Sequence, residues 1–251
     1  MRGSAARRAA LIPYLTAGFP TPAVSLEALR VVAGAGADFL EVGIPFSDPL
    51  ADGPTIQRST QAALDQGMTV ARVLEQIHRA ALTIPVIVMT YLNPVLAFGL
   101  ERFVRDAAAA GVSGLVLTDF PAGADPEIEA LVGASPLVWI RLIAPTTSPE
   151  RLTRAVRGAS GFLYLISRLG VTGARDQVPP DLAGHVGRVR AASPLPLAVG
   201  FGIGTPAQAR ATAALADGVV VGSAIVEALG QDGLGAAERL VRELAAAVRT
   251  P

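Results

Sequence analysis

Residues 38–57 read DFLEVGIPFSDPLADGPTIQ, an apolar run with one carboxylate that passes into a loop rich in proline, aspartate and glycine. The run predicts a β-strand over residues 38–43, with Phe39, Glu41 and Gly43 on one face, because side chains alternate along a strand. A carboxylate within an apolar strand is costly unless it is paired or functional. A salt bridge to an arginine would explain Glu41, but its position at a strand end favours catalysis.

The alternation of apolar runs and helical patterns continues along the whole chain. Further strands are predicted at 10–16, 84–90, 114–118, 137–143, 161–166, 196–200 and 217–221. Amphipathic stretches predict helices that include 22–35, 69–82, 100–110, 148–157, 205–215 and 233–248. This order indicates a parallel sheet with crossover helices, and no GxGxxG follows the first strand to favour a dinucleotide fold. We therefore predict an α/β fold, one (β/α)8 TIM barrel over residues 1–251.

Charge balance and cysteine content exclude several classes of protein. Acidic and basic residues number 21 each, so the net charge is zero and no nucleic-acid partner is expected. The absence of cysteine excludes disulfides, thiolate metal sites and cysteine nucleophiles. No apolar run has the length of a membrane span, so we expect a cytoplasmic protein without membrane contact.

Every basic residue is an arginine, and the chain contains no lysine. Without a side-chain primary amine, the protein cannot form a Schiff base. The two histidines, His78 and His185, fall in predicted helices away from strand ends, where surface or packing roles are expected. No His, Asp and Glu cluster has the spacing of metal ligands, so no metal site is predicted.

Two connections are longer than usual for this fold, residues 44–60 and 167–180. Both leave the C-terminal ends of predicted strands, the face where barrel enzymes place their active sites. Asp48 and Asp52 in the first loop could each be a turn residue, since aspartate before proline or glycine is common in turns. A second carboxylate near Glu41 would also allow separate acid and base roles, which favours function for Asp52.

Glycine pairs follow the seventh and eighth predicted strands, in VGFGIGTP and VVVGSAIV. Barrel enzymes commonly bind phosphate with these two loops and the N-terminus of a short helix. Gly202 and Gly204 would let backbone amides approach the anion. Gly222 and Ser223 would begin the short helix. Each pair alone could be a tight turn, but together they predict a phosphate site.

Tyr164 lies in the sixth predicted strand, where core packing is the commoner role of a tyrosine. In the loop behind it, Arg168, Thr172 and Gly173 could form part of a closing lid or belong to an ordinary solvated loop. Without lysine, cysteine or metal, carboxylates must move protons on a substrate that is its own electron sink. Indole is such a group, since protonation of its ring carbon C3 lets the attached side chain leave by retro-aldol cleavage.

The sequence resembles the alpha subunit of tryptophan synthase over about residues 9 to 248. The most specific segments are LEVGIPFSDPLADGPTIQ and GFLYLISRLGVTGAR, and PYLTAGFP, MTYLNP, VGFGI and VVGSAIV also match. The resemblance implies a carbon–carbon lyase that cleaves indole-3-glycerol phosphate to indole and glyceraldehyde 3-phosphate in tryptophan biosynthesis.

The resemblance also assigns roles to single positions. Glu41 would give and take protons at indole C3 and the side-chain hydroxyl, Asp52 would hold the indole N–H, and Tyr164 would lie beside the glutamate. Gly173, Gly202, Gly222 and Ser223 match phosphate-binding positions, Tyr14, Tyr91, Leu117 and Phe201 match indole-pocket positions, and Thr172 matches a lid threonine that contacts the aspartate.

A partner is implied as well, a pyridoxal-phosphate-dependent beta subunit in an α2β2 complex that receives indole through an internal tunnel. The positions that match the docking surface are Pro45, Asp48, Pro49, Asn93 and Pro121. No cofactor is expected in this chain, because pyridoxal phosphate would belong to the partner. Thr118 and Phe120 depart from the family, which usually has Pro-Asp-Leu-Pro in place of Leu-Thr-Asp-Phe-Pro.

Two alternatives remain. Another phosphate-binding barrel enzyme of tryptophan or sugar-phosphate metabolism would need a catalytic lysine, metal-binding histidines on strands or a Cys–Asp pair, and these are missing. A non-catalytic allosteric partner subunit would have no need to keep both Glu41 and Asp52.

Overall fold

The computed structural model of the protein describes residues 8–166, 179–200 and 202–249. The strands within these ranges are β1 (Ala10–Thr16), β2 (Leu40–Gly43), β3 (Val86–Thr90), β4 (Val112–Leu117), β5 (Val138–Trp139), β6 (Arg141–Ile143), β7 (Leu163–Ile166), β8 (Leu197–Gly200) and β9 (Gly218–Val221). They form one parallel sheet in the order β5-β4-β3-β2-β1-β9-β8-β7-β6.

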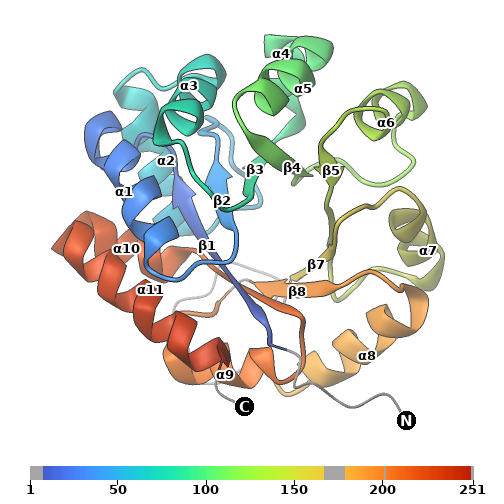
Figure 1. Ribbon diagram of the computed structural model, residues 1–251. Coiled ribbons are helices and arrows are strands. Elements are labelled where there is room, and N and C mark those ends of the chain that lie inside the picture. The colour runs from blue at the N-terminus through green and yellow to red at the C-terminus, as the bar shows by residue number, and fades with distance from the viewer. Residues whose placement is uncertain (1–7, 167–178, 201, 250–251) are drawn as a thin grey trace.

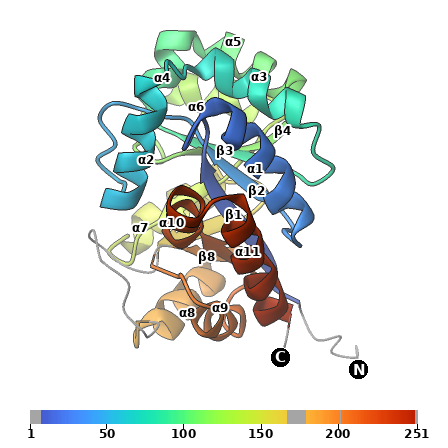
Figure 2. The same cartoon turned by 90° about the vertical axis from the view of Figure 1, so that its left-hand side faces the viewer.

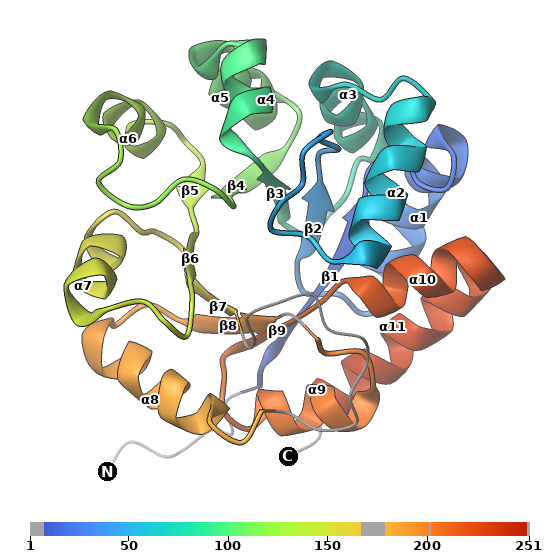
Figure 3. The same cartoon turned by 180° about the vertical axis from the view of Figure 1, so that it is seen from behind.

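The sheet is an almost closed barrel. The two ends of the strand order, β5 and β6, are consecutive in the chain and flank Ile140, so they are two parts of the single strand predicted at 137–143. Figure 3 shows the strands around a central axis with the helices outside them. The predicted TIM barrel is therefore confirmed.

Helices cover the outside of the barrel along its whole circumference (Figure 1). They are α1 (Pro22–Gly34), α2 (Pro54–Asp65), α3 (Val70–Ala80), α4 (Leu92–Phe98), α5 (Leu100–Ala109), α6 (Pro126–Gly133), α7 (Pro149–Arg157), α8 (Leu182–Ala192), α9 (Pro206–Ala213), α10 (Ser223–Asp232) and α11 (Leu234–Arg249). Six of them coincide, within a few residues, with the amphipathic stretches predicted from the sequence. Helix α11 packs beside α1 and β1, which brings the last helix together with the first strand and the first helix (Figure 2).

The predicted loop over residues 44–60 is shorter than expected, because α2 begins at Pro54. Gly53 is the N-cap and proline occupies the first helical position, where its missing N–H costs nothing. The buried face of α2 carries Ile56, Ser59, Thr60 and Ala63, so half of it is hydroxyl-bearing. Because serine and threonine occupy part of the buried face, the sequence shows no apolar stripe of helical period, and the helix was not predicted.

Two separate layers of buried side chains follow from strand alternation. One layer lies between strands and helices and contains Leu40 and Val42. The other fills the barrel interior and comes from β1, β3, β4, β7, β8 and β9 and from the residue between β5 and β6. It comprises Ile12, Tyr14, Ile87, Met89, Val116, Ile140, Tyr164, Ala198 and Val220, with Ile56 and Val226. Phe39 packs against this second cluster, and its ring meets that of Phe162 edge-on at 6.3 Å. The predicted split of residues 38–43 between two faces is confirmed.

Candidate active site

Glu41 lies in the barrel interior with a side chain that is 2% exposed. It is the register partner of Tyr14 on β1 and of Ile87 on β3, both in the interior layer. Burial is the main cause that raises its pKa from 4.5 to about 8, and the negative charge of Asp52 adds to the shift. No ion pair within the described part of the chain involves Glu41. The salt-bridge explanation therefore finds no support, and an acid–base role does.

Asp52 is also buried, at 7% exposure, although it lies in the loop between β2 and α2. The hydroxyl of Tyr91 donates to Asp52 Oδ2 at 3.1 Å and accepts from the N–H of Ala51 at 2.9 Å. Gln57 Nε2 donates to the carbonyl of Asp52 at 2.9 Å. Burial raises the pKa of Asp52 from 3.8 to about 6, and the Tyr91 hydrogen bond opposes that rise. The loop thus holds the carboxylate in place from two sides.

The pKa values of the two carboxylates lie on either side of neutrality. At neutral pH, Glu41 therefore keeps its proton for the larger part while Asp52 is mostly ionised. This division of states gives one group that can donate a proton and one that can stabilise positive charge.

Tyr14 and Tyr164 line the same interior, and each leans over a glycine at the C-terminal end of the next strand. A Cβ atom at Gly43 would lie 2.0 Å from the Tyr14 hydroxyl, and one at Gly200 would lie 2.5 Å from the Tyr164 hydroxyl. Burial raises both tyrosine pKa values well above their ordinary range, with the Glu41 charge a further cause. Both phenols are therefore neutral and can only exchange hydrogen bonds at physiological pH.

Gly43→Ala is expected to destabilise the protein by about 1–3 kcal/mol, because the new methyl group overlaps the Tyr14 ring. The free energy of unfolding is measured by chemical denaturation for Gly43→Ala alone and in a Tyr14→Leu background. The destabilisation should be smaller in that background, because the ring that the methyl group overlaps is absent. Gly34→Ala is the control, since nothing lies within 4 Å of its added methyl group. Equal losses in both backgrounds would contradict this contact.

The implied indole-pocket positions are not all found together. Tyr14 and Tyr91 lie at the carboxylate site, and the ring of Phe46 packs on Tyr91 with centroids 5.2 Å apart. Leu117 instead belongs to the layer between strands and helices, whereas its neighbour Val116 faces the interior. The expectation for Leu117 is off by one residue, which moves a side chain to the other face of a strand.

The predicted phosphate loops meet at one place. Gly222 is the N-cap of α10, Ser223 begins that helix and is exposed, and Gly202 has a φ of +83°. A Cβ atom at Gly204 would lie 3.2 Å from the Ala224 side chain, so the loop after β8 touches the first turn of α10. The amide of Gly204 donates to Gln208 Oε1 at 2.8 Å, whereas the first amides of α10 have no partner within their own helix, as at any helix N-terminus.

This phosphate-type end adjoins the carboxylates. A Cβ atom at Gly222 would lie 3.4 Å from Tyr14, the tyrosine that also covers Gly43. Tyr14 therefore connects the start of α10 to the strand that carries Glu41. Thr172, Gly173 and Phe201, together with the proposed lid over 167–180 apart from its last two residues, lie outside the described residues.

The positions matched to a docking surface lie in loops at the C-terminal ends of β2, β3 and β4. Asp48, Asn93 and Pro121 are exposed and Pro49 is half-buried, but Pro45 is buried and offers no surface. The sequence reading missed Leu50, whose side chain is 94% exposed in the same loop as Asp48. A leucine between Pro49 and an Ala-Asp-Gly turn was the available signal.

No group of three or more His, Cys, Asp or Glu in the described ranges could hold a metal ion. His78 is exposed in α3 and His185 lies in α8, 3.7 Å from Asp181, so both are away from the carboxylates. None of the helices described is long and apolar enough to cross a membrane.

The fold and the site together define a (β/α)8 barrel with two buried carboxylates, Glu41 and Asp52. Over residues 2–250 the sequence matches the profile of the tryptophan synthase alpha chain. It is 44% identical to the tryptophan synthase alpha chain of Chloroflexus aurantiacus, covering 98% of this chain and 96% of that one. The alpha chain of Gluconacetobacter diazotrophicus is 48% identical over 92% of this chain and 85% of its own.

Solved structures agree. A structure of tryptophan synthase from Mycobacterium tuberculosis superposes with a TM-score of 0.90 at 45% identity, covering 98% of this chain and 94% of the other. The tryptophan synthase subunit alpha of Legionella pneumophila gives 0.88 at 36% identity, covering 96% and 93%. The chain belongs to the tryptophan synthase alpha chain family, and its role is that of the alpha subunit in tryptophan biosynthesis.

Proposed function

We propose that this protein cleaves indole-3-glycerol phosphate to indole and glyceraldehyde 3-phosphate, as a carbon–carbon lyase. The observation that carries the proposal is a pair of buried carboxylates that influence each other, Glu41 on β2 and Asp52 in the loop after it, with pKa values of about 8 and about 6. Two such groups can supply an acid and an anion at the same pH. Membership of the tryptophan synthase alpha chain family supports this choice of substrate.

The protonated carboxyl of Glu41 donates its proton to ring carbon C3 of the indole. The positive charge that develops over C2 and N1 is stabilised by ionised Asp52, which accepts a hydrogen bond from the indole N–H. The bond between C3 and the first side-chain carbon then breaks, and its electron pair restores the aromatic ring.

The aldehyde forms as the hydroxyl on that side-chain carbon loses its proton to the Glu41 carboxylate. One proton leaves Glu41 and one returns, so the carboxyl is regenerated and no external acid is consumed. Tyr14 on β1 and Tyr164 on β7, both neutral, would pack against the indole ring. The interior site excludes water from the cation.

The phosphate of the substrate would bind at Gly202, Gly222 and Ser223, where the α10 N-terminus presents backbone N–H groups. Gly173 completes the phosphate set expected from the family, while Phe201 would line the indole pocket and Thr172 would contact Asp52 from the lid. Tyr91 also acts on Asp52, because its hydrogen bond lowers the pKa of that carboxyl and so favours the ionised form.

A beta subunit is the expected partner, in an α2β2 complex, and pyridoxal phosphate would be bound by that subunit alone. Asp48, Pro49, Asn93 and Pro121 would contact it, and exposed Leu50 adds an apolar anchor to this surface. We place the complex in the cytoplasm.

The test is an indole-release assay with the purified protein and indole-3-glycerol phosphate, with and without a bacterial tryptophan synthase beta subunit. Indole and glyceraldehyde 3-phosphate should appear in equal amounts, faster with the beta subunit. The dephosphorylated substrate is the control and should react poorly, because the α10 site is left empty. No release of indole under either condition would overturn the proposal.

A further inference from the structure

A buried ionic cluster lies away from the carboxylates, between β6 and α6. Arg141 on β6 is 3% exposed, although its strand neighbours Trp139 and Ile143 belong to the apolar layer under the helices. Its Nη2 donates to Glu129 Oε1 at 2.7 Å, and its Nε donates to the carbonyl of Gly158 at 3.4 Å. Burying an arginine costs free energy unless its charge is paired, and the contact with Glu129 provides that pairing.

Aromatic rings cover the other side of the guanidinium. Its central carbon lies 3.5 Å from the ring centroid of Trp139 and 5.6 Å from that of Phe120. The two rings stack on each other at 5.6 Å with planes 26° apart. Arg141 Nη1 is buried without a hydrogen-bond partner in the described part of the chain, so ring contact is what it has.

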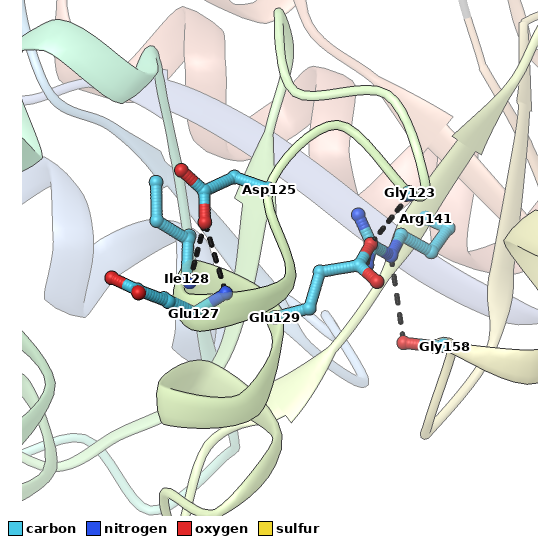
Figure 4. Close-up of polar contacts among 7 residues, drawn as sticks. All are labelled: Gly123, Asp125, Glu127, Ile128, Glu129, Arg141 and Gly158. Atoms are coloured by element: carbon cyan, nitrogen blue, oxygen red, sulfur yellow. Dashed lines mark hydrogen bonds and ion pairs between the residues drawn. The ribbon is translucent and has the colours of Figure 1, made fainter.

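The carboxylate of Glu129 connects this cluster to the loop before α6. The Oε1 atom that binds Arg141 also accepts from the N–H of Gly123 at 2.8 Å. Asp125 ends the same loop as the N-cap of α6 and accepts from the amides of Glu127 and Ile128. Figure 4 shows the loop held between these two contacts.

The other end of that loop reaches the active site. Phe120, stacked on Trp139, follows Asp119, whose Oδ1 accepts from the N–H of Leu92 at 2.8 Å. Leu92 begins α4 and directly follows Tyr91, whose hydroxyl donates to Asp52. A continuous set of contacts therefore joins the buried arginine to the catalytic loop.

We propose that Arg141 is a positioning residue, which with Glu129 holds the 118–125 loop so that Asp119 fixes the start of α4 and Tyr91 holds Asp52. The inference rests on the proposed function for its kinetic consequence only. The departures of this chain at Thr118 and Phe120 are then explained by the structure. Phe120 attaches the loop to the cluster by packing against Trp139 and Arg141. Thr118 donates to the Thr90 carbonyl at the end of β3.

Arg141→Met is the decisive variant, because an unbranched apolar side chain of similar length keeps the packing and removes the charge. We expect kcat for indole release to fall about fivefold to twentyfold with KM for the substrate changed less than twofold. The acidic limb of the pH profile should move upward, since Asp52 loses part of the Tyr91 hydrogen bond that lowers its pKa. Arg141→Lys, which keeps the charge near Glu129, should recover part of kcat.

Tyr91→Phe separates positioning from simple loss of structure. If Arg141 acts through Tyr91, adding Arg141→Met to Tyr91→Phe should change kcat and the acidic limb no further. Independent, multiplying losses in the double variant would overturn the proposal. Arg79→Met is the matched control, because Arg79 is an exposed arginine that pairs with Glu75 on α3. It should leave both readouts unchanged.

A readout that needs no turnover keeps this inference distinct from the proposed reaction. Carbon-13 NMR of aspartate-labelled protein gives the pKa of Asp52 directly, assigned by its loss in Asp52→Asn. The groups that face Asp52 are Glu41 from β2, Tyr14 from β1, Tyr91 after β3 and Tyr164 from β7. An upward shift in Arg141→Met supports positioning even if no indole forms, and an unchanged Asp52 titration overturns it.

Discussion

Glu41→Gln is expected to lower kcat for indole release roughly a thousandfold, which is the range typical of a lost general acid and base. The amide fits the same interior position beside Tyr14 and Ile87 but carries no proton to give to indole C3. Binding of the substrate should be retained, because the phosphate end at Gly222 is unchanged. The measurement is steady-state indole release at saturating substrate, with substrate binding followed by calorimetry.

Stability gives an independent check on the same variant. The folded protein holds the Glu41 proton up to about pH 8, while the unfolded chain releases it near 4.5. Between these values the folded state binds more protons, so its free energy of unfolding falls as the pH rises through this window. Glu41→Gln removes that loss and should be more stable than the wild type at about pH 9, by an amount on the order of 5 kcal/mol.

A drop in activity that comes with a drop in stability at every pH would point to disrupted folding instead of lost chemistry. Gln57→Ala serves as the control for a change near the site, because within the described part of the chain this exposed side chain bonds only the backbone carbonyl of Asp52. It should cost far less in kcat than Glu41→Gln. Equal losses in the two variants would contradict the assignment of Glu41 as the acid.

The strands of the barrel were predictable because they appear in the sequence as apolar runs whose side chains alternate between two faces. Each predicted strand has a counterpart, and residues 38–43 divide between two faces as alternation requires. Helices α2, α4 and α6 were not predicted. The buried face of α2 includes the polar residues Ser59 and Thr60, and α4 and α6 are too short to show a helical period of apolar residues.

The position of Glu41 inside the barrel was predictable, but the packing around it was not. The glycine at position 43 shares a face with Glu41, and a glycine inside a strand signals the close approach of another group. That the approaching group is Tyr14 from the neighbouring strand depends on register, which the sequence does not reveal. Arg141 was overlooked for a similar reason, since its partners Glu129 and Gly158 lie on separate elements.

Asp52→Asn is the second substitution with a large expected effect, a fall in kcat of roughly a hundredfold. The amide keeps the shape of the side chain and can still meet Tyr91, but it brings no negative charge to the cation that forms on the indole ring. A variant that loses charge and keeps contacts should lose kcat more than affinity. Steady-state kinetics over a range of pH measures both quantities.

The pH profile of Asp52→Asn tests how the two carboxylates influence each other. In the wild type, kcat/KM should rise as Asp52 ionises near pH 6 and fall as Glu41 loses its proton near pH 8. The variant should lack the rise. Its fall should move to lower pH, because the Asp52 charge that helps to raise the Glu41 pKa is gone. A basic limb that stays in place or moves upward would mean that Asp52 and Glu41 do not share one electrostatic site, and the division of acid and anion between them would fail.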